Sequence, residues 1–494
     1  MTTDPPGGVA ETIPLWSLTD DSLVEISEDG SLVVVTRWGE HEFPHAEPLV
    51  VESLRRMALG PVSLANVTSS WEPVEREPDL EGELSWTAEG ADALRQVLKE
   101  LGGSVVRSLG LADGRGPLLS VIPVVLAPVF APVAIPATRP IRLSRFSSLR
   151  SDADGMGLES PSARYRVVLS QPWAVHVAAT LATAKSVGEI VTTTGIDRGV
   201  VGAIVSYLVA AGVVQAAGEN GRFAEDDDPE LGVWSPDELS FHTTSRTWRP
   251  GGPADLAGLG NPPVVKAPTG EGPSYSLFRP DLAERAETDP TLTALLENDH
   301  SCPEFTESVL SAEQIGEFLF RGARIRSIGP AHLPNGPAHS ASQRPYFSVA
   351  CLYELELYVS VNRCSGLDRG IYHYDPLGHR LSLVNDDVAD LDEMLDIAMI
   401  GGGNHRRPSA LITVTARMPR MASVLGGGAY ATTLAHVGAL QQTLYLVARA
   451  MGLAAHAVPV DAGDRVDRAL KLDWPAEVGV GECVLDLPVD AVGE

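Results

Sequence analysis

The feature that most constrains the fold is the long apolar run TLAHVGALQQTLYLVARAMGLAAH, residues 433–456. Its length and composition predict a nearly all-apolar, buried helix at about residues 431–451. The runs SALITVTA, LELYVSV and ECVLDLPV predict strands, the first of them fully buried. A central apolar helix mixed with buried strands predicts a C-terminal domain of the α+β class.

Local signals support further elements in this half of the chain. The stretch SAEQIGEFLF begins with Ser311 and has Gln314 three residues later, which predicts a capping box at the start of a helix. The stretch GIYHYDP predicts a strand that ends in a hairpin turn near residues 376–378. Core patterning starts at residue 299, so we expect this domain to span residues 299–494.

The first half contains a weak internal repeat. Asp29-Gly30 precedes Pro48, and Asp154-Gly155 precedes Pro172, by intervals that differ by only one residue, and an apolar helix pattern follows each proline. The second copy continues over residues 186–225 as helix, turn, helix and a hairpin with Asn220 near its tip, an order typical of winged-helix modules. We therefore expect an N-terminal α/β module at 1–140 and a winged-helix-like module at 141–225.

Residues 226–298 are rich in Pro, Gly and acidic side chains, which predicts an extended linker over the surface. Pro123, Pro128, Pro132 and Pro136 interrupt the apolar stretch 117–137, so we expect extended buried pieces and no membrane span. The N-terminus lacks the basic and apolar regions of a signal peptide, and four scattered cysteines are typical of reduced thiols, so we expect a cytoplasmic protein.

The charge balance bears on partners. The formal net charge is −28, from 65 acidic and 37 basic residues, which disfavours a nucleic-acid partner. The second helix of the winged-helix-like stretch offers only Arg198 for a base or phosphate contact, so that module is expected to contact protein or peptide.

The stretches RPYFSVACLYELELYVSVNRCSGLDRGIYHYDPLGHRL (344–381) and AYATTLAHVGALQQTLYLVARAMGLAAHAV (429–458) resemble the azoline dehydrogenases of the nitroreductase superfamily. These enzymes act in ribosomal-peptide pathways of the streptolysin, cyanobactin and thiopeptide kind. FHTTSRTW (241–248) and ARIRS (323–327) are also similar to family text. The resemblance implies a nitroreductase-like domain, a dimer with FMN at the subunit interface, and oxidation of a thiazoline or oxazoline in a precursor peptide to the azole.

The family's functional motifs are altered in this sequence. Its Arg-Arg-Ser-x-Arg phosphate motif corresponds to DHSCP, in which only Ser301 is retained, and its Pro-Ser-Gly-Gly motif corresponds to FSVA, in which Ser348 is retained. A Lys-Tyr pair expected within SVLG (423–426) is absent. The resemblance leaves six residues as candidate FMN contacts: Ser301, Arg344, Ser348, Gln442, Gly452 and Leu453.

Two side chains near the altered loop could replace the missing base. Tyr430 and His436 are the candidate catalytic residues, although each also suits an ordinary packing role. Five arginines could replace the phosphate motif or merely solvate helix and strand ends: Arg321, Arg324, Arg326, Arg417 and Arg420. His332, His339, His373 and His379 lack metal-ligand spacing, so we predict no metal site.

Two hypotheses follow. In the first, the chain is an FMN-dependent dehydrogenase that forms azoles on a ribosomal precursor peptide. In the second, it is a catalytically degenerate, flavin-poor relative that binds a peptide or pairs with an active paralogous dehydrogenase and a cyclodehydratase.

Overall fold

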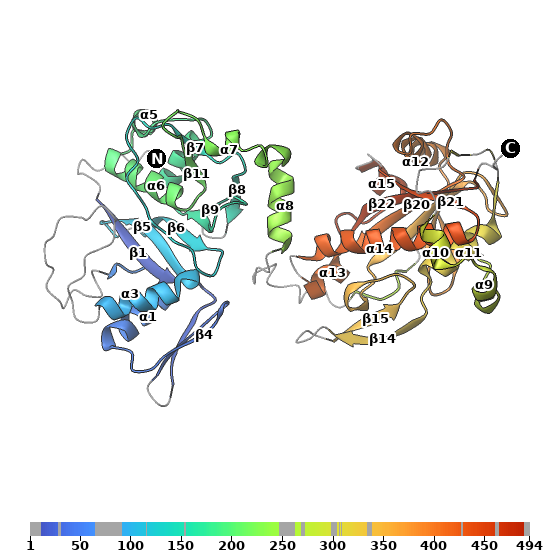
Figure 1. Ribbon diagram of the computed structural model, residues 1–494, viewed down its shortest axis with the longest axis horizontal. Helices are drawn as coiled ribbons and strands as arrows, with labels where there is room; N and C mark the ends of the chain where they lie inside the picture. Colours follow the sequence, from blue (N-terminus) through green and yellow to red (C-terminus); the bar gives the residue numbers. More distant parts are fainter. Residues whose placement is uncertain are drawn as a thin grey trace. The chain divides into compact units, whose positions relative to one another are not determined.

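The computed structural model describes residues 11–27, 31–64, 91–114, 116–152, 155–246, 262–267, 272–297, 304–305, 307, 309–332, 338–425, 428–459 and 464–488. Its contacts divide the chain into two compact units, residues 1–244 and 245–494, and Figure 1 shows both. Each unit contains strands and helices, so the predicted α+β class is confirmed.

The strands of unit 1 are β1 (Thr12–Leu18), β2 (Leu23–Ile26), β3 (Leu32–Thr36), β4 (Gly39–Phe43), β5 (Val105–Leu111), β6 (Pro117–Pro123), β7 (Ile141–Leu143), β8 (Ser148–Asp152), β9 (Gly155–Glu159), β10 (Tyr165–Leu169) and β11 (Val214–Ala216). Its helices are α1 (Pro48–Leu59), α3 (Ala91–Glu100), α4 (Pro172–Thr180), α5 (Val187–Thr194), α6 (Arg198–Ala210), α7 (Ala224–Asp227) and α8 (Pro236–Arg246), the last of which crosses the division between the units.

An antiparallel six-stranded sheet of order β1-β5-β6-β10-β9-β8 runs through unit 1. It joins strands from both sides of the boundary that the sequence predicted at residues 140/141. Helices α4, α5 and α6 contribute Val177, Ile190 and Ile204 to the core of this sheet. The two predicted modules therefore share one sheet, because every residue of β10 pairs with β6.

The weak repeat corresponds to two similar supersecondary units. Strands β2-β3-β4 and β8-β9-β10 are each an antiparallel meander, and each is followed by a helix with proline at its first position, Pro48 or Pro172. Pro suits this position because its missing N–H has no helical partner there. Of the two Asp-Gly turns, Asp29, Gly30 and Asp154 lie outside the described residues, and only Gly155 is described.

The wing of the winged-helix prediction does not form. Helices α5 and α6 are present, but β11 pairs with β7, far upstream, and not with a following strand. The predicted tip is a tight turn in which the Arg222 N–H donates to Asn220 Oδ1, and the chain then enters α7. The cause is local: residues 224–227 read Ala-Glu-Asp-Asp, and the acidic side chains suit the first turn of a helix better than a strand.

The apolar stretch 117–137 forms strand β6 and then continues without regular structure. Beyond β6 the expected burial is only partial, because Leu126, Val129 and Val133 are more than half exposed while Phe130 and Ile135 pack against the core. Among the described helices of the chain, none has the length and apolarity that a membrane crossing requires.

The strands of unit 2 are β12 (Ser274–Ser276), β13 (Leu310–Ser311), β14 (Ser327–His332), β15 (Ala338–Gln343), β16 (Leu355–Val361), β17 (Cys364–Ser365), β18 (Gly370–Asp375), β19 (Arg380–Asn385), β20 (Ala410–Arg417), β21 (Ala454–Val458) and β22 (Glu477–Asp486). Its helices are α9 (Leu282–Thr288), α10 (Leu292–Leu296), α11 (Ala312–Ala323), α12 (Val388–Gly401), α13 (Met418–Leu425), α14 (Ala429–Ala450) and α15 (Asp464–Ala469).

A seven-stranded antiparallel sheet of order β12-β19-β18-β16-β20-β22-β21 forms the centre of unit 2. Alternate residues of β16 and β20 face opposite sides, as strand geometry requires. Ile412 belongs to the core that contains α11 and α14, whereas Leu411 belongs to the core that contains α12 and α15. The sheet is thus covered on both faces, and α14 crosses one of them (Figure 1).

The predicted elements of this half are confirmed. The long helix predicted at about 431–451 is α14, and the capping box of Ser311 and Gln314 starts α11. The hairpin turn near 376–378 joins β18 to β19. One expectation needs correction: α14 buries only one face within the chain, and Tyr430 and Leu434 on another face are 43% and 39% exposed.

The predicted linker is also structured. Its described residues include α9, α10 and strand β12, which pairs with β19 at the edge of the central sheet. Residues 262–267 pass over buried charged side chains, and Val264 and Leu277 are buried. The core therefore starts well before residue 299. A Pro- and Gly-rich segment can be buried when its backbone carbonyl groups accept hydrogen bonds.

Candidate functional site

His436 lies near the start of α14 and is completely buried. Its Nε2 accepts a hydrogen bond from the Val349 N–H at 2.8 Å, so the ring proton is on Nδ1. Nδ1 donates to Oε1 of Glu354, also at 2.8 Å. Both ring nitrogens are used within the chain, and in this arrangement neither is presented to a substrate.

The loop held by His436 covers residues 348–353 and includes Ser348, Val349 and Ala350 of FSVA, the altered Pro-Ser-Gly-Gly motif. Ser348 Oγ accepts from the Tyr353 N–H at 3.0 Å, and His339 Nε2 contacts the Ala350 carbonyl at 2.9 Å. Ala350 and Cys351 have φ of 53° and 54°, in the left-handed region that glycine adopts without strain. The loop keeps a glycine-like backbone although its residues carry side chains.

Arg344 is nearly buried, at 5% exposure, and points into the same region. Its Nη1 donates to the Leu355 carbonyl at 3.2 Å, and its guanidinium carbon lies 5.5 Å from the centre of the Tyr353 ring. Its Nη2 is buried and makes no hydrogen bond to any residue in the described part of the chain. An unpaired buried guanidinium nitrogen is unusual and favours an additional acceptor.

The remaining predicted residues do not gather around this loop. Gln442 is exposed on α14, and Gly452 and Leu453 follow the C-terminal end of that helix. At 1.5 Å per residue, Gly452 and Leu453 lie about 30 Å from Tyr430 along the axis of α14. Ser301 lies outside the described residues.

The positions of these residues show whether one chain can hold FMN. The predicted contacts that the structure describes do not converge within one chain, and the Val349 N–H, a donor in the loop aligned with the flavin motif, is bonded to His436. The described residues of a single chain therefore do not fit a complete flavin site.

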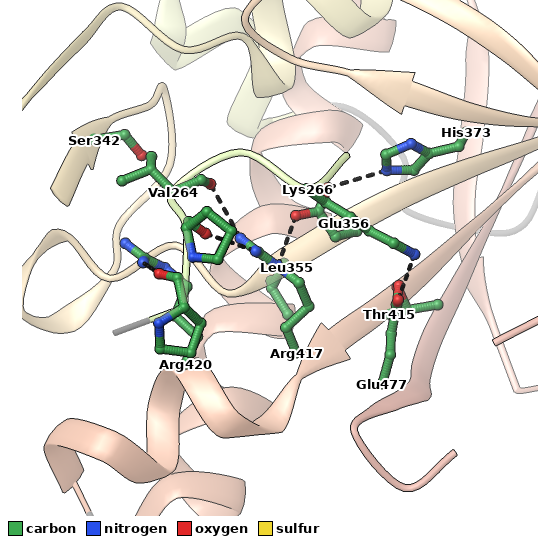
Figure 2. Close-up of polar contacts among 12 residues, drawn as sticks. Val264, Lys266, Ser342, Leu355, Glu356, His373, Thr415, Arg417, Arg420 and Glu477 are labelled. Carbon is green, nitrogen blue, oxygen red and sulfur yellow. Dashed lines mark hydrogen bonds and ion pairs between the residues drawn. The ribbon is translucent and has the colours of Figure 1, made fainter. Parts of the chain in front are cut away.

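Figure 2 shows a second cluster of buried charges. One of its members, Arg420, donates to a backbone carbonyl of the loop. Glu356 on β16 pairs with Arg417 Nε at 2.9 Å and with His373 Nε2 at 3.2 Å. Burial alone would raise the pKa of Glu356, but the hydrogen bond from His373 and the charges of Arg417 and Arg344 together lower it. Glu356 is thus held as a carboxylate.

The strap, defined here as residues 262–267, is bound to this cluster. Arg417 donates to the carbonyls of Pro263 and Val264 at 2.7 and 3.0 Å. Lys266 Nζ donates to Tyr358 Oη at 2.6 Å. It also donates to Glu477 Oε2 at 2.5 Å (Figure 2). The sequence analysis missed this role of Lys266, and the only local signal was a lysine beside two valines inside a Pro-rich segment.

Arg420 is 1% exposed and is surrounded by carbonyl groups. It donates to Leu352, Pro262 and Ser340 at 2.5, 2.9 and 2.6 Å. Burial, together with the charges of neighbouring Arg417 and Arg344, lowers the pKa of Arg420 to about 10. In this structure Arg417 and Arg420 bind backbone and Glu356, so they do not form the replacement phosphate grip considered from the sequence.

The other three candidate arginines divide into two kinds. Arg321 is ion-paired with Glu317 and Asp289. Arg324 and Arg326 instead line a cleft of about 260 Å³ with a third arginine, Arg279. The cleft is completed by Phe320, Ile325, Pro376, Leu377 and His379.

The described residues contain no group of three or more His, Cys, Asp or Glu side chains that could hold a metal ion. Three of the four scattered histidines have other partners, His339 among them. His373 binds Glu356, and His379 contacts the Phe278 carbonyl and Tyr374 Oη.

Comparison with known proteins adds a family match. Residues 141–250 match the family model of the cyanobactin oxidase ThcOx. The resemblance to the azoline dehydrogenases is confirmed. The matched azoline dehydrogenase-like stretch ends just after FHTTSRTW, residues 241–248, which the sequence analysis had singled out. A search of curated proteins found no significant match.

Several solved structures match part of this chain. A nitroreductase-type protein of Ralstonia eutropha JMP134 is 18% identical, over 45% of this chain and 93% of its own, with a TM-score of 0.34. A second, of Anabaena variabilis ATCC 29413, is 20% identical, over 50% of this chain and 45% of its own, with a TM-score of 0.35. The Escherichia coli microcin synthetase McbBCD complex with truncated pro-MccB17 gives 19% identity, over 53% and 95%, with a TM-score of 0.33.

Proposed function

We propose that this chain is an azoline dehydrogenase-like component of an azole-forming ribosomal-peptide pathway, and that it acts as a peptide-binding or partner subunit without its own complete flavin site. The cyanobactin oxidase match over residues 141–250 supports the pathway. The observation that carries the partner role is that His436 uses both ring nitrogens inside the chain. A base must present a free nitrogen to the proton that it removes.

The exposed face of α14 supports a partner. Tyr430 and Leu434 are partly exposed on a helix whose other face packs in the core. Ala435, Gly438 and Gln442 are exposed farther along the same helix. An apolar helix face of this kind is suited to pairing with another subunit. We propose a paralogous dehydrogenase that carries the intact motifs as the occupant, with a cyclodehydratase supplying the azoline substrate.

One observation favours the alternative, an FMN-dependent dehydrogenase that oxidises thiazoline or oxazoline itself. The buried Arg344 Nη2 makes no hydrogen bond in the described part of the chain and would suit an anionic group. In that case a second chain would complete the site, and Ser348 would contribute from this one.

The test is the absorption spectrum from about 300 to 550 nm of the purified chain with and without FMN, followed by gel filtration. The partner role predicts that FMN is removed on the column. Retention of nearly one flavin per chain would overturn it and establish the alternative.

Pairing is tested separately by gel filtration with a flavin-loaded paralogue from the same gene neighbourhood. Leu434→Arg is expected to abolish co-elution. The matched control is Leu149→Arg, because Leu149 is similarly exposed, at 43%, but lies on β8 in unit 1.

A further inference from the structure

The arginine cleft, lined by the residues named above, is built from three separate segments of unit 2. Arg279 follows β12, Arg324 and Arg326 follow the C-terminal end of α11, and Leu377 lies in the turn between β18 and β19. Its positive charges come from the three arginines, and its walls include the Phe320 ring. Such a cleft combines oxyanion binding with apolar contact.

The positive charge of this cleft is not neutralised by described neighbours. Arg279, Arg324 and Arg326 make no ion pair with any acidic side chain in the described ranges. The nearby turn carboxylate, Asp375, is bound to Arg380 and to two backbone N–H groups. Three like charges converge here in a chain whose net charge is −28, and an anion would relieve their repulsion.

Two of the arginines are held in place before any ligand binds. Arg324 Nη1 donates to the Phe320 carbonyl at 2.9 Å while its guanidinium stacks 4.6 Å from the centre of the same ring. Arg279 Nη2 donates to the Gly378 carbonyl at 3.0 Å. Each guanidinium has five N–H donors, so both keep donors for a ligand.

His379 packs against the cleft without adding charge. Its Nε2 contacts the Phe278 carbonyl at 2.8 Å and its Nδ1 contacts Tyr374 Oη at 2.9 Å. Burial lowers the pKa of His379, and the charges of Arg279 and Arg324 act in the same direction. The binding charge therefore resides on the three guanidinium groups.

We infer that the arginine cleft binds an acidic peptide segment in which carboxylate and apolar side chains are neighbours. The inference rests on the proposed peptide-binding role and names the chemistry of the segment. Phe320, Pro376 and Leu377 in the lining can contact an apolar side chain of a peptide, which a free phosphate ion lacks. Strand β14 starts at Ser327, next to Arg326, and is paired only with β15 among the described strands. An extended peptide can lie along such an open strand edge.

The experiment uses fluorescence anisotropy with the full chain. The probe is a labelled synthetic peptide of alternating glutamate and leucine, and a glutamine–leucine peptide is the neutral reference. Arg326→Gln and Arg279→Gln are each expected to weaken binding of the acidic probe roughly three- to tenfold, because partly exposed charge pairs are screened. Arg406→Gln removes one positive charge from an exposed site elsewhere in the unit and is the matched control.

Three outcomes would overturn the inference. The first is equal binding of the neutral peptide, the second is equal loss in Arg406→Gln and in the cleft variants, and the third is no binding of the acidic probe. Inorganic phosphate is added as a competitor, and displacement with the same arginine dependence at similar concentration would reassign the cleft to phosphate. FMN retention, measured on the same samples, reports on the proposed function independently.

Discussion

Replacement of His436 by alanine is expected to destabilise unit 2 by about 3–5 kcal/mol. The imidazole is fully buried, donates to Glu354 at 2.8 Å and accepts from the Val349 N–H at 2.8 Å. Alanine leaves both groups buried without this partner, at about 1–3 kcal/mol each, which accounts for most of the range. The volume left by the ring adds the cost of a cavity.

The assay is thermal and urea unfolding of the full chain. For a unit of this size the loss corresponds to a decrease in Tm of roughly 6–20 °C in the transition of unit 2. His176→Ala is the control, because His176 is an exposed histidine on α4 of unit 1 and should change stability little. A loss below about 1 kcal/mol for His436→Ala would refute the structural role and restore His436 as a candidate base.

Three further predictions concern other buried groups. Burial raises the pKa of the Glu482 carboxyl group from 4.5 to about 7, so this group lowers the stability of the folded state increasingly as the pH rises from 4.5 to 7. Glu482→Gln should therefore stabilise the protein by about 3 kcal/mol above neutral pH. In melting experiments this gain should decrease progressively towards pH 4.5. Ala350→Gly should raise the free energy of unfolding by up to about 1 kcal/mol, measured in urea, because Ala350 has φ of 53°. Lys266→Met should lower the free energy of unfolding by about 3 kcal/mol and speed proteolysis within the strap, because Glu477 stays buried without its cation. An unchanged cleavage rate would contradict the role of Lys266 in holding the strap.

Much of the local structure could be predicted from the sequence because its signals are local. The capping box at Ser311 depends on residues three apart, and the hairpin turn after β18 depends on adjacent residues. The long helix predicted at about 431–451 is Ala429–Ala450. The linker was predicted wrongly, because composition reports the flexibility of a free segment and not the partners that it meets.

The candidate site was less predictable, because its contacts join residues far apart in the chain. His436 meets Glu354 82 positions away, and Lys266 meets Glu477 211 positions away. No spacing rule reaches across such distances. The sequence determined which segments form helices and strands, and which catalytic motifs of the family are altered. Only the tertiary structure decided that His436 and Arg420 are occupied by internal partners while Arg279, Arg324 and Arg326 converge on a cleft, because hydrogen bonding and charge balance depend on neighbours that folding brings together.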